Sequence, residues 1–165
     1  MSAGYGTGQA ARDLAAAALL RAVLVADGGA WRRMGPAAAP GSFHGAVLDS
    51  RQVRPGVLFV GLPGTRVDGR RYAPDAVRAG AVALVGPGDG EDLAPGGPVP
   101  PQGVLLVSDD PQAAMTVLAD RWRQRHQPVL VGITGSNGKT TTKDLLAALL
   151  RGAGAVHATG GNYNS

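Results

Sequence analysis

Residues 132–142 constrain the fold of this chain most, because they place a glycine-rich run between an apolar segment and a helix-forming segment. The run reads Gly-Ile-Thr-Gly-Ser-Asn-Gly-Lys-Thr-Thr-Thr, follows Pro128–Val131 and leads into Lys143–Leu150. Strand, glycine loop and helix in this order form a phosphate cradle, because the glycines and the helix start direct backbone N–H groups toward an anion. The pattern predicts a nucleotide-binding site, with Lys139 on the outer phosphates and the Thr140 hydroxyl on Mg²⁺.

The glycine spacing departs from the general P-loop pattern, in which four residues separate a glycine from Gly-Lys-Ser/Thr. The position that should hold this glycine is Ile133, and the glycines stand instead at 132, 135 and 138. With 26 glycines in the chain, a chance Gly-Lys-Thr must be considered, but the flanking strand and helix patterns argue against it. The spacing also argues against a P-loop kinase or GTPase.

Composition narrows the function classes. The 165 residues are enough for one domain or a small pair, and the absence of cysteine excludes disulfides, thiolate metal sites and cysteine nucleophiles. The net charge of +4 comes from scattered arginines without a dense basic tract, which favours anionic, phosphorylated small molecules over nucleic acid. We therefore expect no nucleic-acid partner.

No segment reads as a targeting or membrane signal. The apolar stretch Leu14–Val25 is broken by Arg21, lacks a basic region before it and is too short to span a bilayer. We expect a cytoplasmic protein without a membrane partner.

The pattern of apolar runs and turn residues predicts an α/β fold. We expect a helix over Gln9–Val25 closed by Gly28-Gly29, a loop over Trp31–Ser42, and a low-complexity loop over Gly86–Gly103. A further helix should begin at Asp110-Pro111, since Asp is a good N-cap and Pro suits the first helical position. Strands are expected at Ala46–Leu48, Val57–Val60, Ala81–Val85, Val104–Val107 and Ala155–Ala158, and a short helix at Tyr72–Ala79.

A second candidate site is Asp49-Ser50-Arg51, at the end of a short predicted strand. Arg offers a planar fork of donors and Ser a hydroxyl, so the pair Ser50-Arg51 could bind a phosphate. A turn with a solvated arginine explains the same residues equally well.

The two stretches together, in this order, resemble the Mur ligases, the ATP-dependent amide-forming enzymes of peptidoglycan precursor synthesis. Thr134–Thr140 matches the family loop Thr-Gly-Ser/Thr-Asn-Gly-Lys-Thr, which explains the shifted glycine. Leu48–Arg51 and the run from Pro55 to Gly69 resemble the family's small N-terminal domain, which holds the UDP-sugar end of the substrate. The resemblance covers about residues 46–165.

The resemblance implies a domain organisation. Residues 1–26 would form an N-terminal helix region and 27–126 a small α/β UDP-sugar-binding domain. Residues 127–165 would begin a parallel-sheet, P-loop ATP-binding domain that is truncated.

The resemblance also implies site residues and ligands. Ser50 and Arg51 would hold the UDP part, with Asp68 and Gly69 shaping the pocket, and Asn162 would approach the γ-phosphate or the substrate peptide. Lys139 and Thr140 would be the catalytic residues, with Thr140 on the metal. ATP and Mg²⁺ would be held by Gly135, Ser136, Asn137, Gly138, Lys139, Thr140 and Thr141.

In the family reaction, ATP phosphorylates the terminal carboxylate of a UDP-N-acetylmuramoyl peptide, and an amine attacks the acyl phosphate. Thr134–Lys143 and Thr159–Asn164 resemble the branch that adds D-alanyl-D-alanine to the tripeptide, and the branch that adds the third residue is the alternative. Further catalytic residues of the family would lie beyond Ser165, so we expect this chain alone to be an inactive monomer. A non-catalytic nucleotide- or UDP-sugar-binding module remains the competing class.

Overall fold

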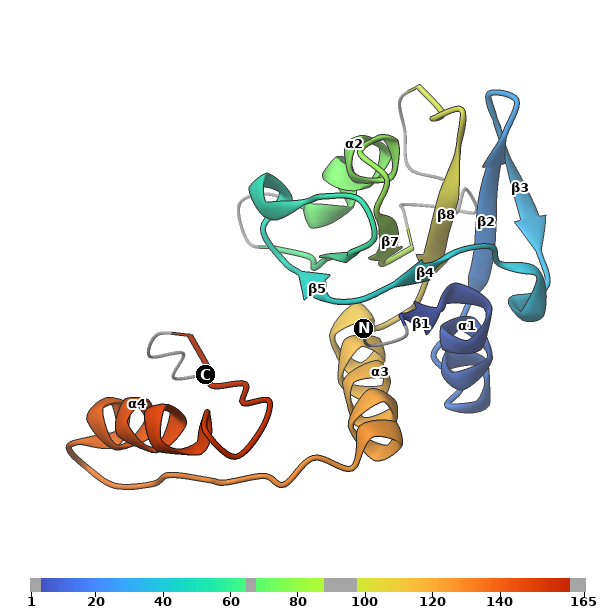
Figure 1. Cartoon of the computed structure of the whole chain (residues 1–165). Coiled ribbons are helices and arrows are strands. Elements are labelled where there is room, and N and C mark those ends of the chain that lie inside the picture. The colour runs from blue at the N-terminus through green and yellow to red at the C-terminus, as the bar shows by residue number, and fades with distance from the viewer. Residues whose placement is uncertain (1–3, 65–67, 88–97, 161–165) are drawn as a thin grey trace. The chain divides into compact units, whose positions relative to one another are not determined.

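The computed structural model describes residues 4–64, 68–87 and 98–160, which fall into two compact units. Unit 1 comprises Met1–Gln127 and unit 2 comprises Pro128–Ser165. Unit 1 holds a β-sheet with helices, and unit 2 holds one helix and its flanking segments (Figure 1). The α/β class expected from the sequence is confirmed.

Unit 1 is built on a mixed six-stranded sheet. Its strand order is β3-β2-β8-β7-β6-β5, in which β5, β6, β7 and β8 run parallel and β2 pairs antiparallel with both β8 and β3. The antiparallel half was not expected from the sequence. The bounds are β2 Ala22–Asp27, β3 Ala30–Met34, β5 Ala46–Val47, β6 Leu58–Gly61, β7 Val82–Val85 and β8 Gln102–Val107.

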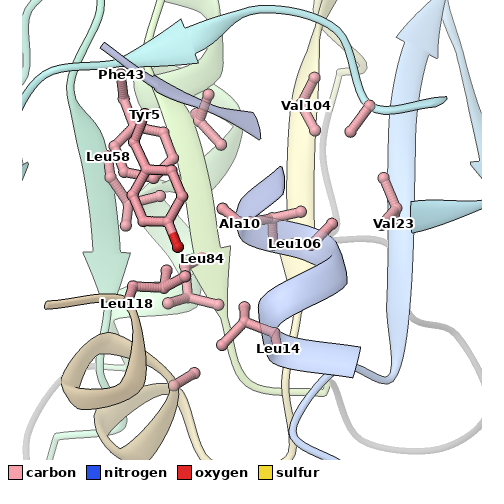
Figure 2. Packing of buried hydrophobic residues seen from close by; sticks show 14 of the residues in the cluster. Tyr5, Ala10, Leu14, Val23, Phe43, Leu58, Leu84, Val104, Leu106 and Leu118 are labelled. Carbon is pink, nitrogen blue, oxygen red and sulfur yellow. The ribbon is translucent and has the colours of Figure 1, made fainter. Parts of the chain in front are cut away.

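The sheet has an apolar core on each face. Helices α1 (Thr7–Ala16) and α3 (Pro111–His126) cover one face, and the short α2 (Ala73–Arg78) covers the other. Figure 2 shows the first core, where Tyr5 lies near Phe43 and Leu58. Short 3-10 turns and a two-stranded ribbon complete the unit: η1 Pro36–Ala38, η2 Ser50–Gln52, η3 Gly69–Tyr72, and β1 Tyr5–Gly6 paired with β4 Ser42–Phe43.

Helix α3 begins where the sequence predicts. The Asp110 carboxylate accepts a hydrogen bond from the Ala113 N–H at 2.9 Å, and Pro111 is the first helical residue. Ala114 and Leu118 are buried and Trp122 packs against the same core, so the predicted helical face is confirmed. The strands expected around Ala46, Val57, Ala81 and Val104 and the helix after Tyr72 are present, whereas residues 88–97 of the predicted loop lie outside the described residues.

The prediction for the N-terminal region is wrong. The expected helix Gln9–Val25 ends at Ala16, since Ala18 takes a left-handed conformation with φ 56° and residues 22–27 form β2. Gly28 and Gly29, with φ of 59° and 85°, turn the chain into the hairpin strand β3, where a loop was expected. Two successive positive-φ residues suit the two-residue turn of a hairpin. Pairing of β2 with the distant β8 overrides the local helix propensity of this alanine-rich segment.

In unit 2, the helix expected after the glycine loop is α4, Lys139–Leu150. The strands expected at Pro128–Val131 and Ala155–Ala158 are not formed in the described residues 128–160. Val129 is 93% exposed, and Leu145 and Leu149 on α4 are exposed too. A strand needs a neighbour to satisfy its backbone, and the described part of unit 2 offers none.

Within the described residues, no helix combines the length and the apolar character needed to cross a membrane.

Candidate functional site

The Asp49-Ser50-Arg51 motif folds around an internal ion pair. Asp49 is the N-cap of η2, and its Oδ1 accepts a hydrogen bond from the Arg51 N–H at 3.0 Å. The Arg51 guanidinium returns to the same carboxylate, with Nε 2.9 Å from Oδ1 and Nη2 2.7 Å from Oδ2. These hydrogen bonds from Arg51 lower the pKa of Asp49 to about 2, and those to Asp49 raise the pKa of Arg51.

The ion pair with Asp49 determines the charge and the orientation with which the Arg51 side chain would contact a ligand. The Arg51 side chain is 87% exposed, while that of Asp49 is 34% exposed. Asp49 therefore neutralises and orients a guanidinium that remains open to solvent. A guanidinium has donors on both edges, so the fork can keep part of its contact with Asp49 while it contacts an anion.

Beside the motif lies a cleft of about 510 Å³ at the carboxyl ends of β5 and β6. Ligands in open α/β sheets bind at such strand ends, and this volume suits a small molecule. Ser50, Arg51 and Gly69, predicted from the sequence, line it together. The full lining is Leu48, Asp49, Ser50, Arg51, Phe59, Val60, Leu62, Gly69 and Tyr72.

Asp68 supports the wall of this cleft without lining it. Its carboxylate accepts a hydrogen bond from the Arg70 N–H at 2.9 Å and caps η3. Gly69, the first residue of η3, donates its N–H to the Leu62 carbonyl at 2.9 Å. The turn that carries Gly69 is thus held against the end of β6.

Sequence reasoning missed Arg70 and Tyr72. Arg70 is only 8% exposed, and its guanidinium donates a hydrogen bond to the carbonyl of Gly86, just after β7. Tyr72 is 41% exposed and adds an aromatic ring to the cleft. Tyr72 could have been suspected of lining the cleft, because it lies close to Asp68-Gly69 in the sequence. Nothing in the sequence shows that Arg70 is buried.

The glycine loop of unit 2 has the backbone that a phosphate cradle needs. Gly135 and Gly138 have φ of 148° and 78°, and Gly138 directly precedes the first residue of α4. A Cβ at Gly138 would meet no atom within 4 Å, so its surroundings are open. No side chain caps the start of α4 by a hydrogen bond. The first N–H groups of a helix lack intrahelical partners, which suits an anion.

Lys139 closes this loop. Its Nζ donates a hydrogen bond to the Gly135 carbonyl at 2.5 Å, on the exposed surface of the loop. Ser136 and Asn137 lie between these two residues, and Thr140 and Thr141 follow in the first turn of α4. The backbone donors and the lysine fit the phosphates of ATP.

The described residues hold no cluster of three or more His, Cys, Asp or Glu side chains that could bind a metal. Asn162 lies outside the described residues.

Comparison with known proteins matches both units to one family. The model described as "Mur ligase family, catalytic domain" matches residues 42–122, and the "Mur ligase middle domain" model matches residues 133–165. The chain is 38% identical over 122 residues to the UDP-N-acetylmuramoyl-tripeptide--D-alanyl-D-alanine ligase of Bacillus subtilis, covering 74% of this chain and 25% of that protein.

A second type of relative is equally similar. The UDP-N-acetylmuramoyl-L-alanyl-D-glutamate--2,6-diaminopimelate ligase of Mesorhizobium japonicum is 39% identical over 125 residues, covering 76% of this chain and 25% of that protein. Crystal structure II of MurF from Acinetobacter baumannii shares the fold, with a TM-score of 0.58 and 24% identity over 90% of this chain and 28% of that one. The chain spans about a quarter of the length of the curated relatives it matches.

Proposed function

The chain belongs to the Mur ligase family, and on that premise we propose that it carries the UDP-sugar cleft and the ATP phosphate loop of a ligase of peptidoglycan precursor synthesis. The observation that carries the proposal is the convergence of Ser50, Arg51 and Gly69 on one cleft. These residues come from two separate sequence motifs. If Asp49-Ser50-Arg51 were only a turn with a solvated arginine, there would be no reason for Gly69 to line the same cleft.

The cleft offers complementary groups for a UDP-sugar. Arg51 would contact the diphosphate with the part of its fork that Asp49 leaves open, and the Ser50 hydroxyl would add a hydrogen bond. Leu62 and Tyr72 provide apolar and aromatic surface for a base or sugar. Asp68 and Gly69 would act by holding the wall in place.

The glycine loop would hold ATP by its phosphates. Lys139 would exchange the Gly135 carbonyl for a phosphate oxygen and neutralise its charge, and Thr140 would face Mg²⁺. Gly135, Ser136, Asn137, Gly138 and Thr141 would contribute the surrounding donors. When bound, ATP supplies the phosphoryl group that activates the carboxylate of the UDP-N-acetylmuramoyl peptide.

We favour D-alanyl-D-alanine as the incoming group, so that the product is an amide with the tripeptide. The runs Thr134–Lys143 and Thr159–Asn164, which resemble this branch, support the choice. Addition of the third residue is the alternative, and relatives of both kinds match the chain. Tighter binding of UDP-N-acetylmuramoyl tripeptide than of the dipeptide would support the first branch, and the reverse order the second. A cytoplasmic monomer is part of the same proposal.

Titration of the 165-residue chain with UDP, followed by NMR, tests the cleft. We expect shifts at residues 48–51 and 69–72. Arg51→Met should weaken binding about 10-fold, since hydrogen bonds to charged groups contribute about 1.5–3 kcal/mol. The matched control is Arg54→Met, an exposed arginine three positions away that does not line the cleft. Equal weakening by both variants, or no binding by the wild type, would overturn the proposed cleft.

Titration with Mg·ATP tests the loop in the same chain. Lys139→Met should abolish the shifts of residues 135–141, and Arg151→Met, at the far end of α4, should leave them unchanged. Binding that survives Lys139→Met would exclude the loop as the ATP site.

A further inference from the structure

The four residues of the 3-10 turn η3 lie in different surroundings. Side chains three positions apart in a 3-10 helix lie above one another. Gly69 and Tyr72 are three positions apart and both line the cleft, so one side of η3 faces the cleft. Arg71 is exposed, whereas Arg70 is only 8% exposed. Arg70 is therefore the residue of η3 that reaches into the interior of unit 1.

Arg70 connects η3 to the carboxyl end of β7. Its guanidinium donates a hydrogen bond to the carbonyl of Gly86, the residue after β7, and its backbone N–H donates to the Asp68 carboxylate at 2.9 Å. The Gly69 N–H donates to the carbonyl of Leu62, the residue after β6. Because β6 and β7 are paired, η3 is attached to the ends of two adjacent strands. Two attachments restrict the rotation of a short turn about its own axis.

Packing alone does not explain an arginine at position 70. Burial of a guanidinium costs desolvation free energy that an apolar side chain of similar volume would not cost. Arginine offers in return a long reach and a planar set of donors, which can hold a main-chain carbonyl in one direction. These properties suit a residue that fixes the geometry of η3.

Tyr72 is the cleft side chain whose direction depends on this geometry. It is the last residue of η3, and α2 follows at once and packs on the same face of the sheet as β7 (Figure 1). Its side is open to the cleft, since Tyr72 is 41% exposed. Among the described residues, no other aromatic ring and no cation packs against the Tyr72 ring. An aromatic ring in this state can stack on a planar base.

We propose that Arg70 is a positioning residue of the cleft, which holds η3 on the carboxyl end of β7 and so directs the Tyr72 ring onto the uracil base of a bound uridine nucleotide. The inference rests on the proposed UDP-sugar cleft and adds to it a residue pair that recognises the base. Arg70 acts through Tyr72 and contacts neither the base nor the diphosphate. Arg51 contacts the diphosphate independently of this pair.

The first measurement locates the base in the wild-type chain. UDP is added to the 165-residue chain, and NMR detects nuclear Overhauser effects between the Tyr72 ring protons and the uracil protons. We expect these effects together with shifts at residues 48–51. Shifts at 48–51 without a contact between Tyr72 and uracil would overturn the positioning role and leave the cleft in place. Absence of UDP binding would remove the cleft and this role together.

The second measurement compares the affinities for UDP and for 5,6-dihydro-UDP, which keeps the diphosphate, the ribose and the base carbonyls but has a puckered, non-aromatic base. The wild type should prefer UDP about 2- to 10-fold, the contribution that an aromatic contact makes beyond its buried area. Tyr72→Leu and Arg70→Met should each bind the two ligands almost equally. Arg70→Lys keeps a cationic donor and should restore part of the preference.

The matched control is Arg71→Met, which removes one positive charge from the exposed position next to Arg70. It should keep the wild-type preference for UDP. The double variant Arg70→Met/Tyr72→Leu should lose no more preference than either single variant, because both substitutions remove the same contact.

The preference is a ratio of affinities, so it does not change when a variant merely weakens the whole cleft. Weaker binding of both ligands by Arg70→Met with the wild-type preference retained would show a structural role only and overturn the proposal. Equal affinity of the wild type for the two ligands, or additive losses in the double variant, would overturn it too. If urea denaturation shows that Arg70→Met does not fold, Arg70→Gln takes its place with the same two outcomes, because glutamine is too short to reach the Gly86 carbonyl.

Discussion

The backbones of Gly61 and Gly69 touch so closely that a Cβ added to Gly69 would lie 2.8 Å from the Gly61 Cα. A Cβ on Gly61 would likewise lie 2.8 Å from the Gly69 carbonyl carbon. The contact joins the end of β6 to the start of η3, and both atoms involved belong to backbone that cannot swing aside. The shape of the proposed UDP-sugar cleft therefore depends on two glycines that contribute no side chain.

Gly69→Ala should push η3 away from β6, lower the free energy of unfolding by about 1–3 kcal/mol as overpacking does, and abolish UDP binding. Urea denaturation and UDP titration measure the two effects. Gly35→Ala is the control, because a Cβ there meets nothing within 4 Å and the φ of −70° suits alanine. Unchanged stability and binding in Gly69→Ala would contradict the close contact.

Asp49 should stay ionised to about pH 2, because the hydrogen bonds from Arg51 lower its pKa from 3.8 to about 2. A carboxyl group whose pKa is lower in the folded chain than in the unfolded chain stabilises the fold at pH values above its unfolded pKa. The contribution of Asp49 to stability is therefore complete above about pH 4 and is lost as the pH falls toward 2. NMR titration of the Asp49 carboxyl carbon in the wild type and in Arg51→Met measures it. In the variant the midpoint should return toward 3.8, and a midpoint already there in the wild type would disprove the ion pair.

Asp110→Ala should destabilise unit 1 by about 0.5–2 kcal/mol, since it removes the hydrogen bond to the Ala113 N–H at the start of α3. Asp110→Asn keeps a side-chain acceptor and should lose much less. Thermal unfolding of the three proteins gives the comparison, and equal losses in both variants would rule out the cap as the cause.

Tyr5 should resist ionisation in the folded chain. Burial, and then its hydrogen bond to the Asp13 carboxylate, raise its pKa well above the usual 10.0. Because the unfolded chain ionises near pH 10, the stability due to Tyr5 is complete below that pH and falls as the pH rises further. The difference in alkaline absorbance between the wild type and Tyr5→Phe reports the Tyr5 phenolate. A phenolate formed at the usual pH in a folded chain would contradict the buried position.

The sequence predicts best where one short stretch contains all the needed chemistry. Asp110-Pro111 starts α3 and the glycine loop leads directly into α4, because caps and glycine turns act within a few residues. Residues 22–25, which the sequence places in a helix, belong to a strand, since their strand character depends on pairing with β8. Apolar residues 128–131 were misassigned to a strand because strand formation depends on a neighbour that their own sequence does not show.

Some features of the candidate site could likewise be predicted from the sequence and others could not. Ser50, Arg51 and Gly69 could be named from their motifs, and the structure brings them to one cleft. Three other contacts could not be predicted from the sequence. They are the ion pair between Arg51 and Asp49, the burial of Arg70, and the hydrogen bond from Lys143 to the Thr159 carbonyl. Each depends on how a long side chain folds back onto a particular carbonyl or carboxylate, and no periodicity in the sequence records that.

The mixed sheet also has a consequence for the order in which the chain is built. Strands β2 and β3 are neighbours in sequence, yet the inner edge of β2 pairs with β8, whose residues 102–107 are synthesised much later. During translation, this hairpin therefore leaves the ribosome with one edge unsatisfied and must wait while the parallel strands between them emerge. The inner edge of β2 is therefore paired only after residues 102–107 have emerged, and until then it is an unpaired strand edge of the kind that favours aggregation.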